Sequence, residues 1–326
     1  MDMTVLGIDI SKKKFDVALL VDKKFWSKSY SNNKAGFEAF CLWLNSREIS
    51  PHICMESTGI YGHALANFLF EKGYLVSMVN PARIKGFGKS ELSRNKTDEA
   101  DAKLIARFCL AMRPGAWQPE PEWQVELKQW VNHLDNLKEL ERMALNRQEV
   151  AIKSVQKAIS KHLKALKIQI EEAKEKIEEF INKDIDLRKK RELLASIPGI
   201  GQVTTAHILA HVGDINRFKT AKKLAAFAGL NPCQRQSGTS IKGRTKLSKI
   251  GSSQFRKSLY MPALVAIRYN PTLKTFYEGL LARGKAKMVA IGAVMRRLLH
   301  IVYGVLKNQQ EFSTKPNCNF FPINAI

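Results

Sequence analysis

The sequence predicts an α/β domain at the N-terminus and a mostly helical chain after it. Over residues 1–120, apolar runs of strand length alternate with helical patterns, which is typical of a sheet covered by helices. Residues 121–192 are charged, contain few helix breakers and repeat apolar residues at helical spacing. Residues 193–326 continue with apolar helical patterns separated by Gly-rich turns. We therefore expect three regions with these boundaries.

The first region predicts strands and helices in alternation. Two strands lie in VLGIDISKKKFDVALLV, with the lysines at the turn between them. HICMES predicts a strand that ends at Glu56, and GIYGHALANFLFEKG predicts a helix that Gly73 terminates. YLVSMVNP predicts another central strand, stopped by Pro81. A helix then follows Thr97 in TDEADAKLIARFCLAM, because threonine is a good N-cap and acidic residues suit the positive end of the helix dipole.

Two apolar stripes run along the second region, whose other positions are filled by Glu and Lys. They indicate a helical hairpin or a coiled coil, serving as a spacer or an oligomerisation device. The alternative is a helix that packs on its own domain. The stripes comprise Leu127, Val131, Leu134, Leu137 and Leu140, and later Ile159, Leu163, Leu166 and Ile170.

The third region begins with PGIG between two helical patterns, in LLASIPGIGQVTTAHILAHVG. This arrangement is typical of a helix-hairpin-helix, in which hairpin glycines let backbone N–H groups reach a DNA phosphate at a helix N-terminus. We therefore expect Gly199 and Gly201 to contact nucleic acid. A plain Pro-Gly turn is the alternative interpretation.

Positive charge is concentrated in one part of the chain. The formal net charge is +23, and residues 201–300 contain 18 Lys and Arg against only two acidic residues, Asp214 and Glu278. A surface that only needs to be solvated mixes both signs, so this excess indicates a polyanionic partner, with nucleic acid as the first candidate. A membrane surface is disfavoured, because no basic amphipathic helix shows an exposed aromatic face.

Several protein classes find no support in the sequence. The five cysteines are scattered without a C-x-x-C pair, which argues against a zinc site and a disulfide framework. No apolar run has the ~20 residues of a transmembrane helix, and no secretory signal is recognisable. No phosphate-loop or dinucleotide fingerprint indicates a nucleotide cofactor. We expect a cytoplasmic protein with reduced thiols.

Four carboxylates of the first region could meet at one edge of the sheet. Asp9 lies inside an apolar strand, where an unpaired carboxylate is costly to bury, and Glu56 ends the strand HICMES. Asp98 and Asp101 share one face of a helix, although simple complementarity to the helix dipole would also explain this pair. Gathered together, the four would repel one another unless one or two hard divalent cations such as Mg²⁺ held them. Basic residues around the helix start would attract a phosphate backbone: Arg94, Lys96 and Lys103.

Motifs along nearly the whole chain resemble one known family. GIDISKKKFDVALL, ICMESTGIYG, VNPARIKGFG and RNKTDEADAKLIARF resemble the catalytic domain of the DEDD insertion-sequence transposases, the RuvC-like recombinases guided by a bridge RNA. SIPGIGQVTTAHILAHVGDINRF, KKLAAFAGLNPCQRQSGTSIKG and LYMPALVAIRYNP resemble the C-terminal transposase domain of that family. The resemblance implies a ribonuclease H-like (RuvC-like) fold for the N-terminal domain.

The resemblance also implies site residues. Asp9, Glu56, Asp98 and Asp101 would form the DEDD tetrad, and Ser237 in QRQSGTS would be a nucleophilic serine. The residues alone do not single out Ser237, because the loop contains further Ser and Thr, and a Ser-Gly step is more often a turn. No histidine stands near to act as its base. Three basic residues of this loop could stabilise charge on a pentacovalent phosphate: Arg235, Lys242 and Arg244.

By this resemblance, the chain would be a site-specific recombinase that moves its own insertion element in a prokaryotic cytoplasm, at the nucleoid. A non-coding bridge RNA would pair with target and donor DNA, and Ser237 would form a phosphoserine link to the cut strand. The family implies a homo-oligomer, a dimer that becomes a tetramer in the active complex, with serine and tetrad from different protomers. Two alternatives stay open: a RuvC-type structure-selective nuclease that uses metal-activated water, and a non-catalytic scaffold that binds RNA and DNA.

Overall fold

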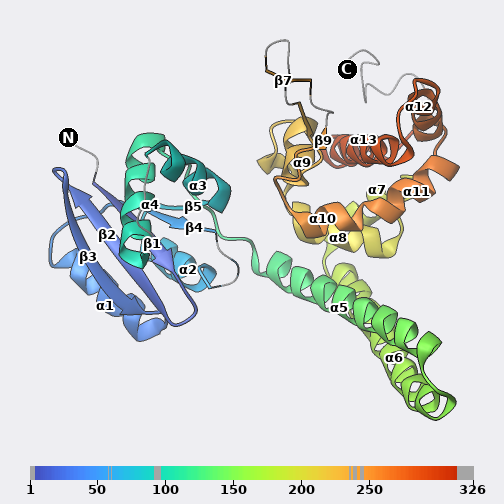
Figure 1. The fold of residues 1–326 in the computed structure, drawn as a ribbon, viewed down its shortest axis with the longest axis horizontal. Coiled ribbons are helices and arrows are strands. Elements are labelled where there is room, and N and C mark those ends of the chain that lie inside the picture. Colours follow the sequence, from blue (N-terminus) through green and yellow to red (C-terminus); the bar gives the residue numbers. More distant parts are fainter. Residues whose placement is uncertain are drawn as a thin grey trace. The chain divides into compact units, whose positions relative to one another are not determined.

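The chain forms two compact units, Met1–Glu120 and Pro121–Ile326. A computed structural model describes residues 4–57, 59, 61–91, 97–234, 236–237, 241–242 and 246–313, without the side chains of 236–237 and 241–242 (Figure 1). The predictions of a mixed α/β sheet at the N-terminus and a helical C-terminal region are confirmed. Each unit is described by itself.

The first unit is built on a five-stranded mixed sheet in the order β3-β2-β1-β4-β5. β1, β2 and β3 form an antiparallel meander, while β4 and β5 run parallel to β1. This mixed sheet is consistent with a ribonuclease H-like domain. The strands are β1 Val5–Ile10, β2 Lys14–Val21, β3 Lys24–Ser31, β4 His52–Glu56 and β5 Val76–Val79.

Helices cover both faces of this sheet. α1 (Lys34–Asn45) and α2 (His63–Glu71) share one apolar cluster with alternate residues of the strands, while α3 (Pro81–Ser90) and α4 (Asp98–Met112) share a second cluster on the opposite face. Successive side chains of a strand point to opposite faces. Leu6 and Ile8 therefore face α1 and α2, while Val5 faces α3 and α4.

Helix α4 lies directly on the backbone of β1. A Cβ on Gly7 would lie 2.1 Å from Ala102 O and 2.3 Å from Ala106 N, so only glycine permits this approach. The side-chain oxygen of Thr97 accepts a hydrogen bond from Ala100 N, which confirms the predicted N-cap. The position of α4 is thus set by its first turn and by its contact with Gly7.

The first unit differs from the sequence prediction in the place of β5 and in three elements that were not predicted, β3, α1 and α3. β5 is an edge strand, and its prediction as a central strand is wrong. Its sequence is apolar like that of a central strand because both of its faces are covered: Val76 and Val79 are buried in different clusters. Its free edge is also partly covered, since Trp117 N donates a hydrogen bond to Val76 O (2.7 Å). β3 was not predicted, because it is mostly exposed and lacks an apolar run.

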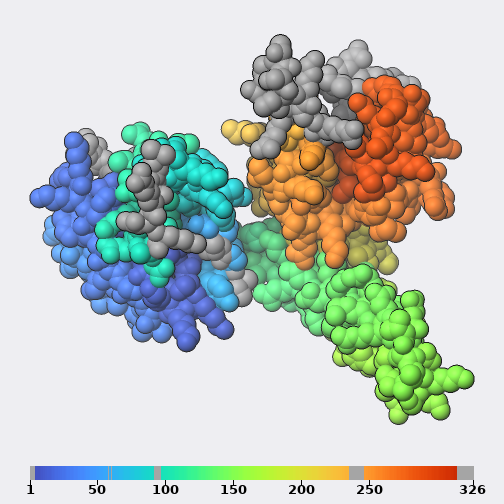
Figure 2. Space-filling view, viewed as in Figure 1, coloured from blue at the N-terminus to red at the C-terminus, as the bar shows by residue number. Residues whose placement is uncertain are grey.

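The second unit begins with a long antiparallel pair of helices, α5 (Glu122–Val150) and α6 (Lys153–Lys183), which extends from the rest of the unit (Figures 1 and 2). Leu127 and Val131 on α5, and Leu163 and Ile170 on α6, are buried in one cluster. Leu140, predicted within the stripe, is 46 % exposed. The pair therefore has the form of a helical hairpin.

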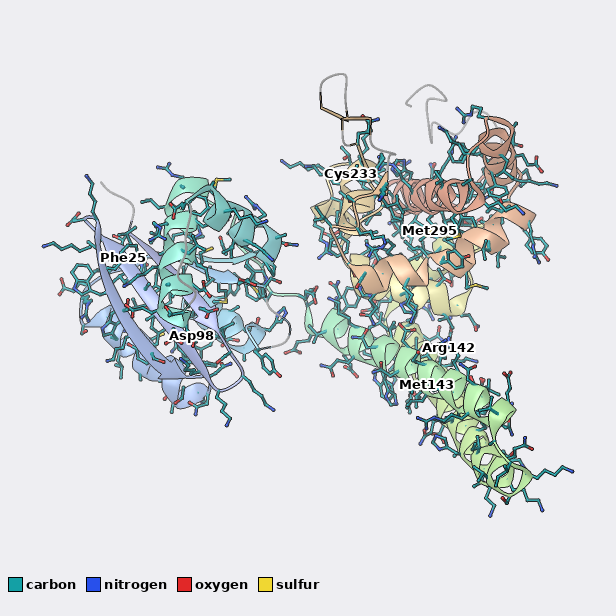
Figure 3. The ribbon with its side chains drawn as sticks, viewed as in Figure 1. Phe25, Asp98, Arg142, Met143, Cys233 and Met295 are labelled. Atoms are coloured by element: carbon teal, nitrogen blue, oxygen red, sulfur yellow. The ribbon has the colours of Figure 1, made fainter. Side chains whose placement is uncertain are left out.

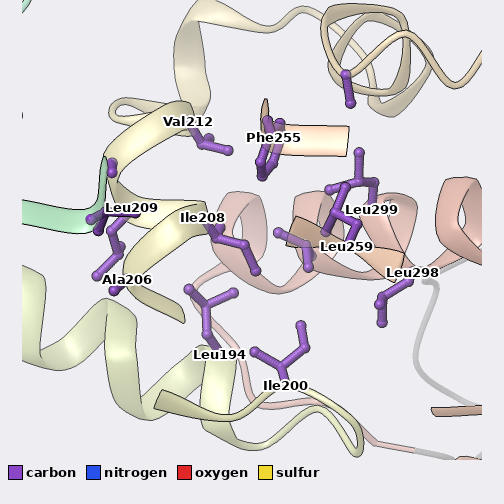
Figure 4. Close-up of a cluster of buried hydrophobic side chains, with 14 of the residues drawn as sticks. Leu194, Ile200, Ala206, Ile208, Leu209, Val212, Phe255, Leu259, Leu298 and Leu299 are labelled. Atoms are coloured by element: carbon purple, nitrogen blue, oxygen red, sulfur yellow. The ribbon is translucent and has the colours of Figure 1, made fainter. Parts of the chain in front are cut away.

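The body of the second unit is a helical cluster around α13. α13 packs against α7, α9, α11 and α12, and Figure 4 shows its Leu298 and Leu299 in one apolar cluster with Ile208 and Leu259. By length and composition α13 could span a membrane, but 61 % of that stretch is buried inside the unit, as in a core helix. The elements are α7 Ile185–Ala195, α8 Gln202–Val212, the 3₁₀ turn Ile215–Arg217, α9 Ala221–Phe227, α10 Ser253–Ser258, α11 Tyr260–Tyr269, α12 Pro271–Ala282 and α13 Lys287–Asn308.

Replacement of Gly7 should destabilise the first unit. Because its Cβ would meet the backbone of α4, we expect Gly7→Ala to lower the free energy of unfolding of this unit by about 3 kcal/mol or more. Gly86→Ala in α3 is the matched control. Nothing lies within 4 Å of a Cβ there, so alanine should be neutral or stabilise the helix by up to about 1 kcal/mol. Native-state hydrogen exchange of peptides from residues 1–120 measures this unit alone. Equal stability of the two variants would contradict the proposed contact.

Candidate active site

The four predicted carboxylates lie on the α4 side of the sheet. Asp9 follows Val5 and Gly7 at intervals of two residues along β1, so it shares their face. Glu56 ends β4 and shares the face of Cys54, which lies in the α4 cluster. Asp98 and Asp101 are in the first turn of α4, and Figure 3 shows Asp98 at the start of that helix. Three elements thus bring the predicted acids to one side of the sheet.

The pKa values show that these carboxylates interact. The pKa of Asp9 is raised to about 6, first by burial and then by the negative charges of Asp101, Asp98, Glu56 and Asp16. The pKa of Glu56 is also raised, by burial and by Asp101. Both shifts have the sign expected when acids gather without enough compensating charge. Asp9 is therefore within electrostatic reach of the other three acids.

A fifth carboxylate and a lysine complete this group. The β1–β2 register places Asp16 opposite Asp9. Lys14 Nζ lies 2.9 Å from Asp16 Oδ2 and 2.8 Å from Asp98 Oδ2, and this ion pair lowers the pKa of Asp98. The sequence analysis did not select Asp16 or Lys14, although the two-residue alternation of the predicted hairpin could have placed Asp16 on the same face as Asp9.

The donor set fits a hard divalent cation in its chemistry. Every acid in the group offers carboxylate oxygens, which Mg²⁺ prefers, and the pKa of Asp9 is raised by burial and then by the neighbouring negative charges. The Lys14 ammonium already brings positive charge to the group. Over the described residues, however, no three carboxylate, His or Cys side chains are close enough to hold an ion as they stand. An ion would require side-chain rotation and the release of Asp98 from Lys14.

The basic residues predicted beside the start of α4 are only partly described. Lys103 Nζ lies 2.7 Å from Glu99 Oε1 and 5.9 Å from the centre of the Phe25 ring. Its charge is therefore partly compensated on the same helix. Arg94 and Lys96 lie outside the described residues.

The two glycines of the PGIG turn have different surroundings. Gly199 has φ of +104°, and a Cβ there would lie 2.7 Å from the Cβ of Ala266, so this glycine allows the turn to pack on α11. Nothing lies within 4 Å of a Cβ on Gly201, which is the N-cap of α8 and provides no side-chain cap. The turn and α11 line a groove of about 410 Å³. Gly201 thus leaves the backbone at the start of α8 open to a ligand.

The backbone of Ser237 lies in a short β-ladder. Ser237, in β7 (Gln236–Ser237), pairs with Ile241 in the antiparallel β8 (Ile241–Lys242). Of the side chains predicted here, those of Ser237 and Lys242 are not described, and Arg235 and Arg244 lie outside the described residues.

The buried histidines of α8 serve packing. His207 and His211 are 3 % and 4 % exposed, their rings are stacked, and His207 Nε2 lies 3.2 Å from Asp135 Oδ1 of α5. Burial lowers the pKa of His211 to about 4, which keeps it neutral. Their burial supports a role in packing between α5 and α8.

Comparisons with known proteins point to one family of transposases. A family described as Transposase IS116/IS110/IS902 matches residues 191–278, and a transposase model of the DEDD IS110 type matches residues 6–156. The pilin gene-inverting proteins of Moraxella bovis and Moraxella lacunata are each 32% identical over 320 residues, which cover 97% of this chain and 99% of theirs. The transposase for insertion sequence element IS1111A of Coxiella burnetii is 24% identical over 343 residues, covering 95% of this chain and 92% of its own.

Neutralisation of Asp9 should stabilise the fold in a pH-dependent way. Because the folded-state pKa is raised, the unfolded chain loses the Asp9 proton first, so stability falls as pH rises from about 4 through 6. Asp9→Asn removes this penalty. The free energy of unfolding of Asp9→Asn should exceed that of the wild type by nearly zero at pH 4 and by roughly 1 kcal/mol at pH 7, after a discount for solvent screening of a half-buried group.

Thermal unfolding from pH 4 to 8 measures this gain. Glu38→Gln, at an exposed carboxylate of α1, is the control and should show no such trend. Added Mg²⁺ should stabilise the wild type more than Asp9→Asn, since a cation relieves the same repulsion. A gain that is independent of pH would contradict the clustering of the acids.

Proposed function

Since this chain belongs to the DEDD transposases of the IS110 family, we propose that it moves its own insertion element by cutting and rejoining DNA at specific sites. Membership of this family makes the chain an enzyme that acts on DNA, a transposase or recombinase. The observation that supports the proposal is the placement of Asp9, Glu56, Asp98 and Asp101 on the α4 side of the sheet, with Asp9 within electrostatic reach of the other three.

Rejoining distinguishes this proposal from simple nuclease activity. The Moraxella relatives are named for the inversion of a gene, and inversion requires that each cut end be joined to a new partner. A RuvC-type nuclease that uses metal-activated water would cut and release the ends. A covalent protein–DNA intermediate conserves the bond energy that rejoining needs, which favours a protein nucleophile.

The tetrad would bind Mg²⁺, one or two ions, next to the scissile phosphate. When bound, Mg²⁺ would neutralise phosphate charge and favour the ionised form of the attacking hydroxyl. In this chain Asp9 and Glu56 would hold the ion from the strands, and Asp98 and Asp101 from α4. Lys14 would release Asp98 and leave its ammonium free to contact the phosphate.

Ser237 would supply the nucleophile. Its hydroxyl oxygen would attack phosphorus, lose its proton and form a serine–phosphate ester, while one deoxyribose oxygen leaves and takes up a proton. One phosphoester replaces another, so the reverse attack by a different deoxyribose hydroxyl rejoins the DNA and frees the serine. Arg235, Lys242 and Arg244 would stabilise the added charge on the phosphate during both steps.

The basic helical region would bind nucleic acid. Target and donor DNA, and a non-coding bridge RNA that pairs with both, all present phosphates to the positive charge of residues 201–300. The PGIG turn would act as a helix-hairpin-helix, with the backbone after Gly201 at a phosphate. We further propose that the active complex is a tetramer in which serine and tetrad come from different protomers, with the α5–α6 hairpin as an oligomerisation device.

Loss of the nucleophile should abolish covalent capture of DNA. We expect Ser237→Ala to lose both strand cleavage and the covalent protein–DNA adduct, by at least about 10³-fold. Asp98→Asn should lose cleavage through the metal site, whereas Ser253→Ala, at an exposed serine of the same region, should retain it. The assay is denaturing capture of element DNA with Mg²⁺ present, followed by mapping of the modified residue. Cleavage that survives in Ser237→Ala would favour the metal-activated water of a nuclease.

Binding should depend steeply on salt. If six or more phosphates are contacted, affinity for element DNA should fall by about 10³-fold or more between 50 and 200 mM salt. Lys222 and Lys223 of α9 are exposed. Replacement of both by Gln should reduce the slope of log affinity against log salt concentration by up to about two. Lys174 and Lys176 of α6, each paired with a glutamate, are the control pair. Filter binding over a salt series measures the slope, and a flat dependence would contradict phosphate binding as the main source of affinity.

A further inference from the structure

The segment that contains Ser237 begins and ends at a closely bonded stem. Residues 227–233 and 246–252, called the stem here, include β6 (Pro232–Cys233) and β9 (Lys246–Leu247), which pair antiparallel. Ser248 N donates to Asn231 O at 2.8 Å, and Ser252 N donates to Phe227 O at 2.8 Å. Figure 3 labels Cys233 in this stem. The β6–β9 and β7–β8 ladders have only two residue pairs each, so the ladders alone hold the segment weakly.

One arginine joins both halves of the stem. Arg256 of α10 donates through Nη1 to Ala228 O (3.1 Å) in the first half and to Lys249 O (3.4 Å) in the second. Gly229, with φ of +69°, makes room for this contact, because a Cβ there would lie 2.3 Å from the same nitrogen. The neighbouring Phe255 is fully buried, so α10 holds the guanidinium from the core of the unit.

A second arginine ties the first half of the stem to α13. Arg296 donates through Nη1 to Leu230 O (3.4 Å) and to the side-chain oxygen of Asn231. Leu247, in the other half, packs on α13 at Gly292, where an added Cβ would lie 3.3 Å from Leu247 Cδ1. The stem is therefore attached to two core helices, through both of its halves.

From these contacts we infer that Arg256 and Arg296 are positioning residues for strand transfer, which set the direction in which the Ser237 segment leaves the helical unit. The inference rests on the proposed role of Ser237 as nucleophile. Ser237 lies six positions after Asn231, which at about 3.3 Å per residue allows a reach of up to ~20 Å. A tilt of about 10° at the stem would then move the serine by roughly 3 Å, whereas nucleophilic attack tolerates well under about 1 Å.

The test uses the full-length protein together with its complete insertion element on a plasmid. Arg256→Met and Arg296→Met remove the two contacts. Arg283→Met is the matched control, because Arg283 also donates to a backbone carbonyl, that of Gly279 at 3.1 Å, on α12 and away from the stem. Covalent adducts are counted after denaturation, and total bound element DNA is counted after reversible crosslinking. Hydrogen exchange of the Ser248 and Ser252 amides reports the stem directly.

In both stem variants, adduct per bound DNA should fall roughly ten- to a hundredfold, while bound DNA and melting temperature match Arg283→Met. The Ser248 and Ser252 amides should exchange faster than in that control. Arg256→Lys, which keeps the charge but has no planar fork, should recover only part of the adduct and provides a folded variant if Arg256→Met does not fold.

Two results would overturn the inference. In the first, hydrogen exchange of the Ser248 and Ser252 amides is the same in the stem variants as in the control. In the second, these amides exchange faster, but the stem variants form as much adduct per bound DNA as Arg283→Met does. Failure of the proposed function looks different. If Ser237 is not the nucleophile, the wild type will form no covalent adduct, or Ser237→Ala will still form it. Either result is independent of the hydrogen exchange measured in the stem variants.

Discussion

The candidate active site depends on the close approach of α4 to β1. Gly7 removes the side chain that would separate them, so the helix backbone lies against the strand. That contact buries Ile105 and Ala106 and brings the first turn of α4 toward the strand that carries Asp9. Burial is the first cause of the raised pKa of Asp9, and the acids of α4 add to it because the close approach of the helix brings them within electrostatic reach. Packing of an apolar helix face is thus the source of an electrostatically unfavourable cluster, a combination typical of functional sites.

Much of this arrangement could be predicted from the sequence because it rests on local patterns. The apolar run around Asp9, the three-residue spacing of Asp98 and Asp101, and the Thr97 cap each depend on neighbours along the chain. The participation of Asp16 and Lys14 depends on the register between β1 and β2, which fixes cross-strand partners. The edge position of β5 depends on the strand order of the sheet, and Trp117, which covers part of that edge by a hydrogen bond to Val76, lies far along the chain. Contacts of this kind require the folded topology.

Charge is distributed unevenly for a physical reason. Carboxylates that must hold a cation lose that capacity when lysines pair with them, as Lys14 does with Asp98. Residues 1–100 carry 14 basic and 11 acidic side chains, so they contribute little to the net charge of +23. The basic excess lies in residues 201–300, where it can attract phosphates without neutralising the tetrad. Under the proposed function, metal binding and phosphate binding would place opposite demands on charge, and the residues proposed for them lie in different units.

Ser237, the proposed nucleophile, lies on a short β-ladder, which raises the question of how firmly it is held. Two-residue ladders provide few hydrogen bonds, and among the described residues neither ladder is part of a larger sheet. A guanidinium group can hold such a ladder in place without apolar packing, because one group bonds several carbonyls in a fixed plane. Its positive charge also attracts a phosphate-containing substrate. Arg256 bonds carbonyls from both halves of the stem, so any separation of the halves breaks at least one charged hydrogen bond. Such contacts are not visible as a motif, because they join a side chain to backbone carbonyls whose identity the sequence does not specify.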